Sequence, residues 1–342
     1  MSFKRLDPDD FVVSAQSITA TCWTGNVTAL TTFYTQSNQV SSVSGKYYTT
    51  VFNTSSAGDN REAQFQIAFG NENGGGALAY NNTAAPGVSP ASTIYGQYRT
   101  LILEDENADF VWGNNSGSQY FYALSVERAR YKESLLPGSI NLTLSGSGTN
   151  NNLELTDNSK MVNLPTYYGT QRVYQMISGS NGVANTSVND QGYTTASGSY
   201  GWFCPDISTI LLNGSALDIT TSEGISLSTT TTANTNGLNN QKAFNVIVNG
   251  KYFALNSEET ITSDFVFVRA RNSEFNYSEN PSYISGSTGE VIYNYFINNP
   301  QTYMTTIGLY NDSNDLLAVA KLSKPLNKDF TKEALVRVKL DF

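Results

Sequence analysis

The 342-residue chain contains no histidine, and this absence removes several kinds of chemistry. Histidine is the usual general base near neutral pH, the usual proton shuttle and the commonest protein ligand of transition metals. Nucleophilic systems of the Ser-His-Asp and Cys-His types are therefore excluded. Any hydrolytic activity would have to rest on carboxylates.

Cysteine is nearly absent as well. Cys22 and Cys204 lie far apart and neither belongs to a Cys-x-x-Cys pair. This spacing predicts neither a metal site nor a disulfide framework. We expect two isolated thiols in apolar surroundings, because unpaired cysteine is usually buried.

Charge is also scarce. Charged residues make up 14% of the chain, and the net charge is -9. An acidic chain repels phosphate, so we expect no nucleic-acid partner. No apolar run approaches the ~20 residues of a membrane span, and the N-terminus has no apolar signal segment. We therefore expect no membrane partner and synthesis in a cytoplasm.

The remaining chemical candidates are weak. Glu104–Glu106 with Asp109 is the densest acidic cluster, but neighbouring residues on a strand point to opposite sides. We interpret it as a solvated loop, with a cation site or paired catalytic carboxylates as alternatives. Asp312–Asp315 lacks the Gly and Glu that complete an EF-hand loop and reads as a polar turn. We expect no enzymatic activity and assign no catalytic, cofactor-binding or metal-binding residue and no cofactor.

What is abundant favours β structure. Hydrophobic residues make up 39% and aromatic residues 12%, while Asn, Ser, Thr and Gly supply much of the surface. Such residues suit strands and turns. The fold class expected is all-β, mainly antiparallel sandwich- or barrel-like sheets, with few short helices. The predicted strands have a period of two, and they include Ser17–Trp23, Lys46–Phe52, Ala63–Phe69, Tyr98–Leu103, Tyr120–Val126, Gln171–Ile177 and Val336–Phe342.

Hairpins are predicted at three places. Asn213-Gly214 and Asn249-Gly250 follow apolar runs, and Asn-Gly is a strong two-residue hairpin signal. A longer polar loop separates Tyr303–Tyr310 from Leu316–Leu322. Helices are limited to possible single turns, at Ala108–Trp112 and Asn294–Asn298.

The uneven distribution of charge suggests three zones. Between Lys132 and Lys242 the only basic residues are Lys160 and Arg172. This predicts an N-terminal β module over 1–137, an inserted low-charge β domain over 138–243, and a C-terminal β module over 244–342. The two outer modules would together form a framework.

A candidate subunit interface follows from the C-terminal zone. Arg269 and Arg271 would share one face of a strand that leads into an aromatic loop with Phe275 and Tyr277. Such arginines suit pairing with carboxylates of a neighbouring subunit, although pairing within the chain, to Glu274 or Glu279, is an equal alternative. The last strand adds three further candidates, Arg337, Lys339 and Phe342. Its cations could contact an acidic neighbour or form a solvated edge that discourages strand pairing.

Several segments resemble a virion structural protein of contractile-tailed, T-even-like phages, especially those of marine cyanobacteria. The resemblance is carried by Ser2–Arg5 with Asp9–Ala15, by Arg271–Pro281, by Thr306–Pro325 and by Val336–Phe342. It implies mainly β structure and no catalytic residues. Within that group the chain is most similar to a baseplate wedge subunit.

The resemblance implies a role in virion assembly. The expected function is that of a structural subunit of the phage tail or baseplate, assembled in the host cytoplasm. The expected partners are other tail or baseplate proteins and further copies of this chain in a symmetric assembly. The alternative is a receptor- or glycan-binding tail protein or fibre adaptor, and the abundant tyrosines would suit sugar stacking.

Overall fold

A computed structural model describes residues 3–35, 47–55, 58, 60–80, 88–114, 118–147, 152–278 and 280–341. The chain is mostly β, and its strand pairs are antiparallel, which confirms the expected fold class. It divides into two compact units. Unit 1 consists of Met1–Ser17 with Thr260–Phe342, and unit 2 consists of Ile18–Glu259.

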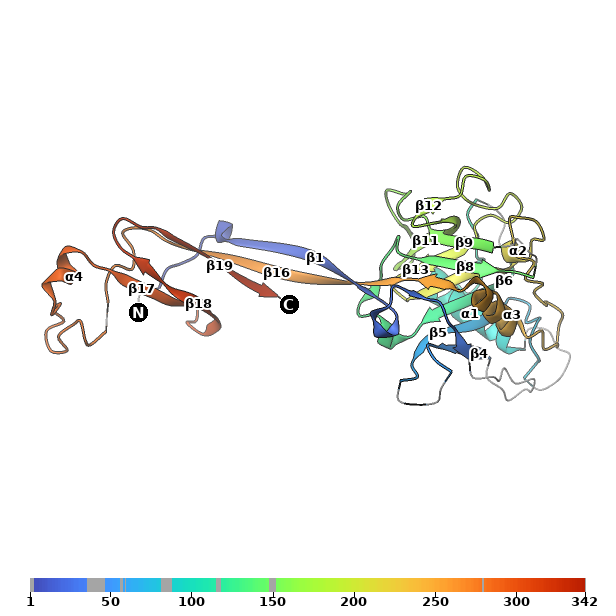
Figure 1. Ribbon diagram of the computed structural model, residues 1–342, viewed down its shortest axis with the longest axis horizontal. Helices are drawn as coiled ribbons and strands as arrows, with labels where there is room; N and C mark the ends of the chain where they lie inside the picture. Colours follow the sequence, from blue (N-terminus) through green and yellow to red (C-terminus); the bar gives the residue numbers. More distant parts are fainter. Residues whose placement is uncertain are drawn as a thin grey trace. The chain divides into compact units, whose positions relative to one another are not determined.

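Unit 2 is built on one 13-stranded, curled sheet (Figure 1). The order along the sheet is β2-β15-β8-β9-β11-β13-β14-β6-β5-β4-β3, and β10 and β12 also pair with β11. The strands are β2 (Ala29–Leu30), β3 (Tyr34–Thr35), β4 (Tyr48–Phe52), β5 (Ala63–Asn71), β6 (Tyr120–Val126), β8 (Asn141–Ser145), β9 (Asn152–Asp157), β10 (Thr166–Tyr168), β11 (Gln171–Ser180), β12 (Val183–Ala184), β13 (Gly201–Cys204), β14 (Thr209–Asn213) and β15 (Tyr252–Ala254).

The units differ from the zones drawn from charge. β6, which precedes residue 137, lies between β5 and β14 in the sheet, and β14 belongs to the zone 138–243. Strands from all three zones therefore contribute to the sheet of unit 2. Surface charge does not reveal this, because backbone hydrogen bonds join strands that are distant in sequence.

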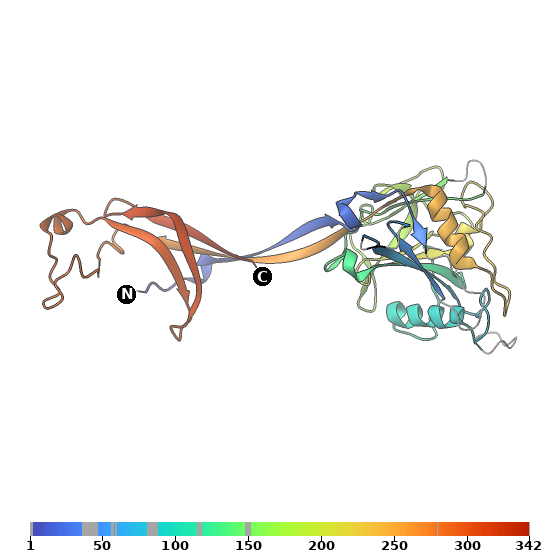
Figure 2. The same cartoon turned by 60° about the horizontal axis from the view of Figure 1, so that its bottom comes forward.

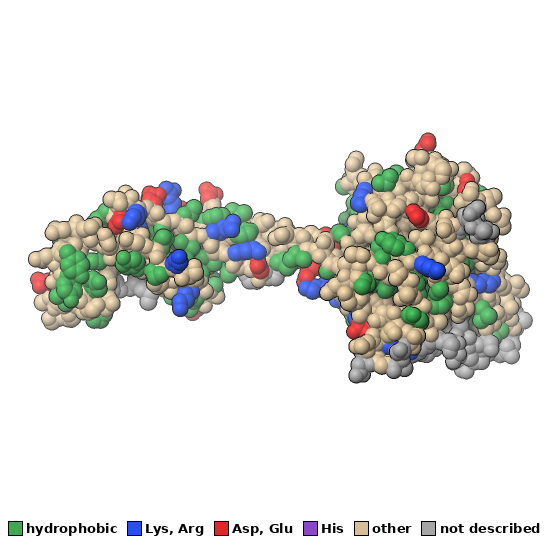
Figure 3. Space-filling model, viewed as in Figure 1, with side chains coloured by type: hydrophobic (Ala, Val, Ile, Leu, Met, Phe, Trp, Pro, Cys, Tyr) green, Lys and Arg blue, Asp and Glu red, His purple; other side chains and the backbone are tan. Residues whose placement is uncertain are grey.

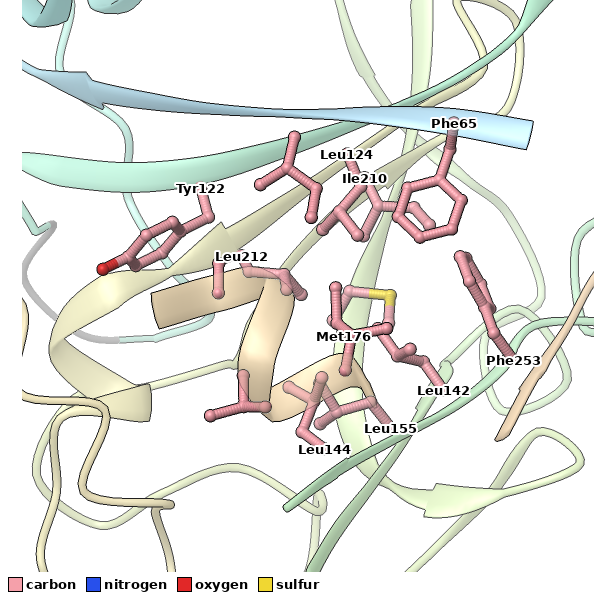
Figure 4. Close-up of a cluster of buried hydrophobic side chains, with 14 of the residues drawn as sticks. Phe65, Tyr122, Leu124, Leu142, Leu144, Leu155, Met176, Ile210, Leu212 and Phe253 are labelled. Carbon is pink, nitrogen blue, oxygen red and sulfur yellow. The ribbon is translucent and has the colours of Figure 1, made fainter. Parts of the chain in front are cut away.

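Both faces of the central strands of unit 2 are buried. On β6, Tyr122 and Leu124 enter one apolar cluster, while Phe121 and Ala123 enter a second. This alternation is the period of two of a strand. The larger cluster lies inside the curl of the sheet, where Phe65, Met176 and Phe253 point toward one another (Figure 4). Unit 2 therefore has a large core of its own, with one cluster on each face of the sheet.

Two helices cover different faces of this sheet (Figure 2). α1 (Pro90–Leu103) buries Tyr95 and Ile102 in the smaller cluster. α3 (Asn239–Gly250) buries Phe244 and Ile247 in the larger one. The short helix α2 (Gly214–Leu217) follows β14 directly.

These helices correct three predictions. The strand expected at Tyr98–Leu103 is the end of α1, which begins after a capping box at Ser89 with proline in the first turn. The hairpin expected at Asn249-Gly250 is the end of α3, where Lys251 adopts φ 58°. The hairpin expected at Asn213-Gly214 is absent because Asn213 caps α2.

Of the two single helical turns that were predicted, one is absent and one is confirmed. The helical turn expected at Ala108–Trp112 does not form, because Phe110 and Trp112 enter the smaller cluster from a segment without helix. The turn expected at Asn294–Asn298 is confirmed as α4. Short elements also flank the strands of unit 2. They are the 3-10 helices η2 (Thr24–Asn26) and η3 (Arg128–Arg130) and the strand β7 (Ser134–Leu135), which pairs with β16.

Unit 1 has a different construction. β1 (Phe11–Thr21), β16 (Asn256–Ala270) and β19 (Ala334–Asp341) pair in that order, and the long β1 and β16 also extend into the residues of unit 2. A separate two-stranded sheet is formed by β17 (Thr302–Tyr310) and β18 (Leu316–Lys328), which confirms the hairpin predicted there. The 3-10 helix η1 (Pro8–Asp10) precedes β1.

Candidate interaction surface

Unit 1 exposes far more apolar surface than it buries. Among the described residues of unit 1, the buried apolar side chains are Val266, Ala270, Phe296, Pro300, Ala334 and Val338. Among its described residues, seventeen large apolar side chains are exposed, and hydrophobic side chains lie among Lys and Arg on the face visible in Figure 3. They are Phe3, Phe11, Val12, Val13, Tyr277, Ile292, Tyr293, Tyr295, Ile297, Tyr303, Tyr310, Leu316, Leu317, Val319, Leu326, Phe330 and Leu335.

The pairing of β16 with β19 decides which candidate residues meet. Val266 faces Val338 on the buried side of the ladder. On the opposite side, Phe267 faces Arg337 and Phe265 faces Lys339. Arg269 lies on this same side, opposite Leu335. The register thus places three of the predicted interface cations, Arg269, Arg337 and Lys339, on one exposed face together with apolar side chains.

The cations of this face have different surroundings. Arg269 pairs with Glu333 at 2.8 Å, and this ion pair lowers the pKa of the Glu333 carboxyl. Lys339 pairs with Asp341 at 2.9 Å, and the lysine holds the pKa of that carboxyl below its ordinary value, helped by the Ser263 hydroxyl.

Of these three cations, Arg337 is the one that lacks an ion-pair partner among the described residues. Its guanidinium lies 5.2 Å from the centre of the Phe265 ring. It is therefore the cation on this face that is most available to a carboxylate of another chain.

The other predicted interface residues lie outside this ladder. Arg271 follows the end of β16, and its charge also helps to lower the pKa of Glu333, the ion-pair partner of Arg269. Tyr277 is 50% exposed, whereas Phe275 is half-buried and has φ 56°. Phe342 lies outside the described residues, as does Glu279. Of the two acidic residues weighed as partners of the arginines, Glu274 pairs instead with Lys4, at 3.0 Å.

A buried lysine holds the loop that carries the aromatic residues. The Lys328 side chain is completely buried, and its ammonium donates to the Asn272 carbonyl, the Asn276 side-chain oxygen and the Asp329 carbonyl, at 2.9, 2.9 and 3.0 Å. Three hydrogen bonds offset the cost of burying the charge. Lys328 is thus a structural anchor of this loop.

The β17–β18 hairpin has one apolar face that unit 1 covers incompletely. Ile307 faces Ala320 and Leu309 faces Ala318, and all four side chains are half-buried. Lys328 is the only residue of either strand that is buried. An isolated two-stranded hairpin is marginal in water, and a further layer is normally needed to stabilise it.

Sequence reasoning found only the end of β1, within the strand predicted at Ser17–Trp23, and missed its first six residues. Ten of its eleven residues are exposed. Phe11, Val12 and Val13 are 51%, 48% and 69% exposed, and because consecutive residues point to opposite faces, β1 exposes apolar groups on both. A signal was present, since Phe11–Thr21 carries no charge over its whole length.

The other chemical candidates do not form a site. Glu104 ends α1 in a left-handed conformation and accepts a hydrogen bond from the Thr170 backbone. Within the described residues, no three Cys, Asp or Glu side chains are grouped to hold a metal ion. Asp312–Asp315 closes the β17–β18 hairpin, with the Asn311 side chain accepting from the Asp315 backbone at 2.7 Å.

Cys22 and Cys204 are free and buried, as predicted. Burial raises the pKa of the Cys22 thiol to about 12 and raises that of Cys204 as well. Among the helices that the structure describes, none is long and apolar enough to cross a membrane.

Comparison with protein-family models, with curated proteins and with solved structures finds no match to the chain.

Proposed function

We propose that the protein is a structural subunit of a contractile phage tail, in the baseplate, and that unit 1 makes its contacts with neighbouring tail proteins. The sequence resemblance supports this assignment. Its segments, 2–15, 271–281, 306–325 and 336–342, all belong to unit 1. The part of the chain that resembles a virion protein is therefore also the part whose apolar surface lacks cover.

The amount of exposed apolar surface is the observation that carries the proposal. The seventeen side chains are between 37% and 69% exposed. Since a large aromatic side chain has roughly 150–250 Å² of surface, they present on the order of 1,000 Å² together. One side of a standard interface is about 800 Å². Unit 1 thus has enough apolar surface for a stable interface.

The described part of unit 2 also exposes fifteen large apolar side chains, but unit 2, unlike unit 1, has a large apolar core of its own. Its two apolar clusters fill both faces of its sheet. All three tryptophans of the chain are in it and all are buried, namely Trp23, Trp112 and Trp202. In the proposed assembly, unit 1 provides attachment and unit 2 is an independently packed body.

Incorporation into particles tests the proposal. A phage lacking the gene for this chain would be complemented with the wild type, with Leu335→Asp in unit 1, or with Val183→Asp in unit 2. The two variants are matched, because Leu335 is 65% exposed and Val183 is 66% exposed. Mass spectrometry of purified particles should find the wild type and Val183→Asp, and much less Leu335→Asp.

Two results would contradict the proposal. The first is absence of the wild-type chain from purified particles. The second is equal incorporation of Leu335→Asp and the wild type, combined with antibody labelling only at the fibre tips. That second result would favour the receptor-binding alternative.

A further inference from the structure

We propose that copies of this chain associate head to tail through unit 1, with the outer edge of β1 in one copy pairing with the outer edge of β19 in the next. This inference names the partner for the surface on which the proposed function rests. Among the described strands, β1 and β19 each pair only with β16, so they are the two edges of one short sheet. Each edge presents unpaired backbone donors and acceptors, which can accept a further strand.

The β1 edge lacks the usual protection against strand pairing. Natural proteins guard exposed edges with charges, prolines, bulges or a covering segment. β1 is eleven residues long and contains no Lys, Arg, Asp, Glu or Pro. Val13, at 69%, is among the most exposed of its side chains. A long uncharged edge with apolar groups on both faces is expected to be covered by another strand in the working protein.

The β19 edge, unlike the β1 edge, carries charged side chains. Arg337 and Lys339 stand on its exposed face, and Leu335 beside them is 65% exposed. The segment before β1 is acidic, with Asp7, Asp9 and Asp10 around η1. A β1 edge with its acidic entry therefore complements a β19 edge with its two cations.

The charges favour this head-to-tail arrangement over a two-fold one. Pairing two β19 edges about their middle would bring Arg337 and Lys339 of both copies together. Pairing two β1 edges antiparallel would place the two acidic turns at opposite ends, away from the cations of β19. Like charges that face each other across an interface disfavour association. Unit 1 as a whole holds ten basic and twelve acidic residues, so copies of it repel one another only weakly.

Head-to-tail contacts have a geometric consequence. Because the two edges are different surfaces, each copy in such an assembly uses both, and the copies close into a ring when the rotation between them allows it.

The oligomeric state of the purified full chain tests this inference without any phage. The wild type should sediment as a multiple of 37.2 kDa. Val13→Asp disables the β1 edge and Leu335→Asp disables the β19 edge, and each alone should associate at least about tenfold more weakly. Val183→Asp, the same change at a similarly exposed position of unit 2, should associate as the wild type does. Tryptophan fluorescence, which reports unit 2 alone, should be unchanged in all three.

A mixture of the two edge variants separates the possible arrangements. Each variant keeps one intact edge, and the two intact edges are complementary, so an equimolar mixture should form a one-to-one dimer although neither variant associates alone. If Leu335→Asp dimerises by itself while Val13→Asp does not, contact is made through β1 alone and the head-to-tail arrangement is wrong.

The remaining outcomes distinguish this inference from the proposed function. A wild-type chain that stays monomeric at every attainable concentration overturns self-association, and its incorporation into particles would still support the tail assignment. A monomeric chain that floats with lipid vesicles would show that the exposed apolar surface serves a membrane instead, which would also overturn the inference. Self-association without incorporation would contradict the tail assignment alone.

Discussion

Replacing Asn213 with alanine should strongly destabilise unit 2. The side chain is fully buried and makes three hydrogen bonds. Its amide donates to the carbonyls of Ser197 and Ser199 at 2.9 and 3.0 Å, and its oxygen accepts from the Ser215 backbone at 3.2 Å. Leaving the buried Ser199 carbonyl unpaired costs roughly 1–3 kcal/mol, and losing the helix cap costs about 0.5–2 kcal/mol. We therefore expect a loss of about 3 kcal/mol.

Urea unfolding followed by tryptophan fluorescence measures this loss directly, because the tryptophans report unit 2. The matched control is Asn185→Ala, which removes an asparagine that accepts from the Ser187 backbone in an exposed turn. It should change the free energy of unfolding by less than about 1 kcal/mol. A loss for Asn213→Ala no larger than that of the control would refute the reasoning that its buried hydrogen bonds stabilise the fold.

Three further predictions follow from other residues. In the folded protein, Cys22 and Cys204 should react with a disulfide reagent at pH 8 at least about a hundredfold more slowly than in urea, because burial raises both thiol pKa values; rapid labelling of native protein would contradict their burial. A backbone N–H and Lys4 lower the pKa of Glu274, so its contribution is present above its ordinary pKa and disappears as pH falls through the lowered value. Glu274→Gln should therefore shift the amide resonance of Lys4 at pH 7 and differ little from the wild type at pH 3, and a difference that persists unchanged at pH 3 would count against the ion pair. Lys328→Met should speed deuterium exchange in the loop after β16 while leaving the fluorescence transition of unit 2 unchanged; unaltered exchange would show that the ammonium does not anchor that loop.

Local patterns predicted the strands that obey a simple period. β5 and β6 were expected at Ala63–Phe69 and Tyr120–Val126, and both form there. The β17–β18 hairpin and the alternation of β19 were also predicted. In these elements the pattern of side chains agrees with the pairing that the tertiary structure provides.

The helices and the Asn-Gly turns show where such patterns fail. Asn213-Gly214 has the composition of a hairpin turn, yet the Asn213 side chain is used to cap α2 and to bind two distant carbonyls. α3 contains β-branched and aromatic residues, but Ala243, Phe244 and Ile247 lie on one face that fills the curl of the sheet. A short segment adopts whichever structure buries its apolar face against the available neighbours, and those neighbours are distant in sequence.

The candidate surface was predictable only in part. The sequence alone determined that the chain is mainly β, that it contains no histidine chemistry, and that its C-terminal segment alternates cations with apolar residues. Only the tertiary structure decided that Arg269, Arg337 and Lys339 share a face, because this depends on the β16–β19 register. It also decided that β1 is an exposed edge, since strand order results from pairing between residues hundreds of positions apart.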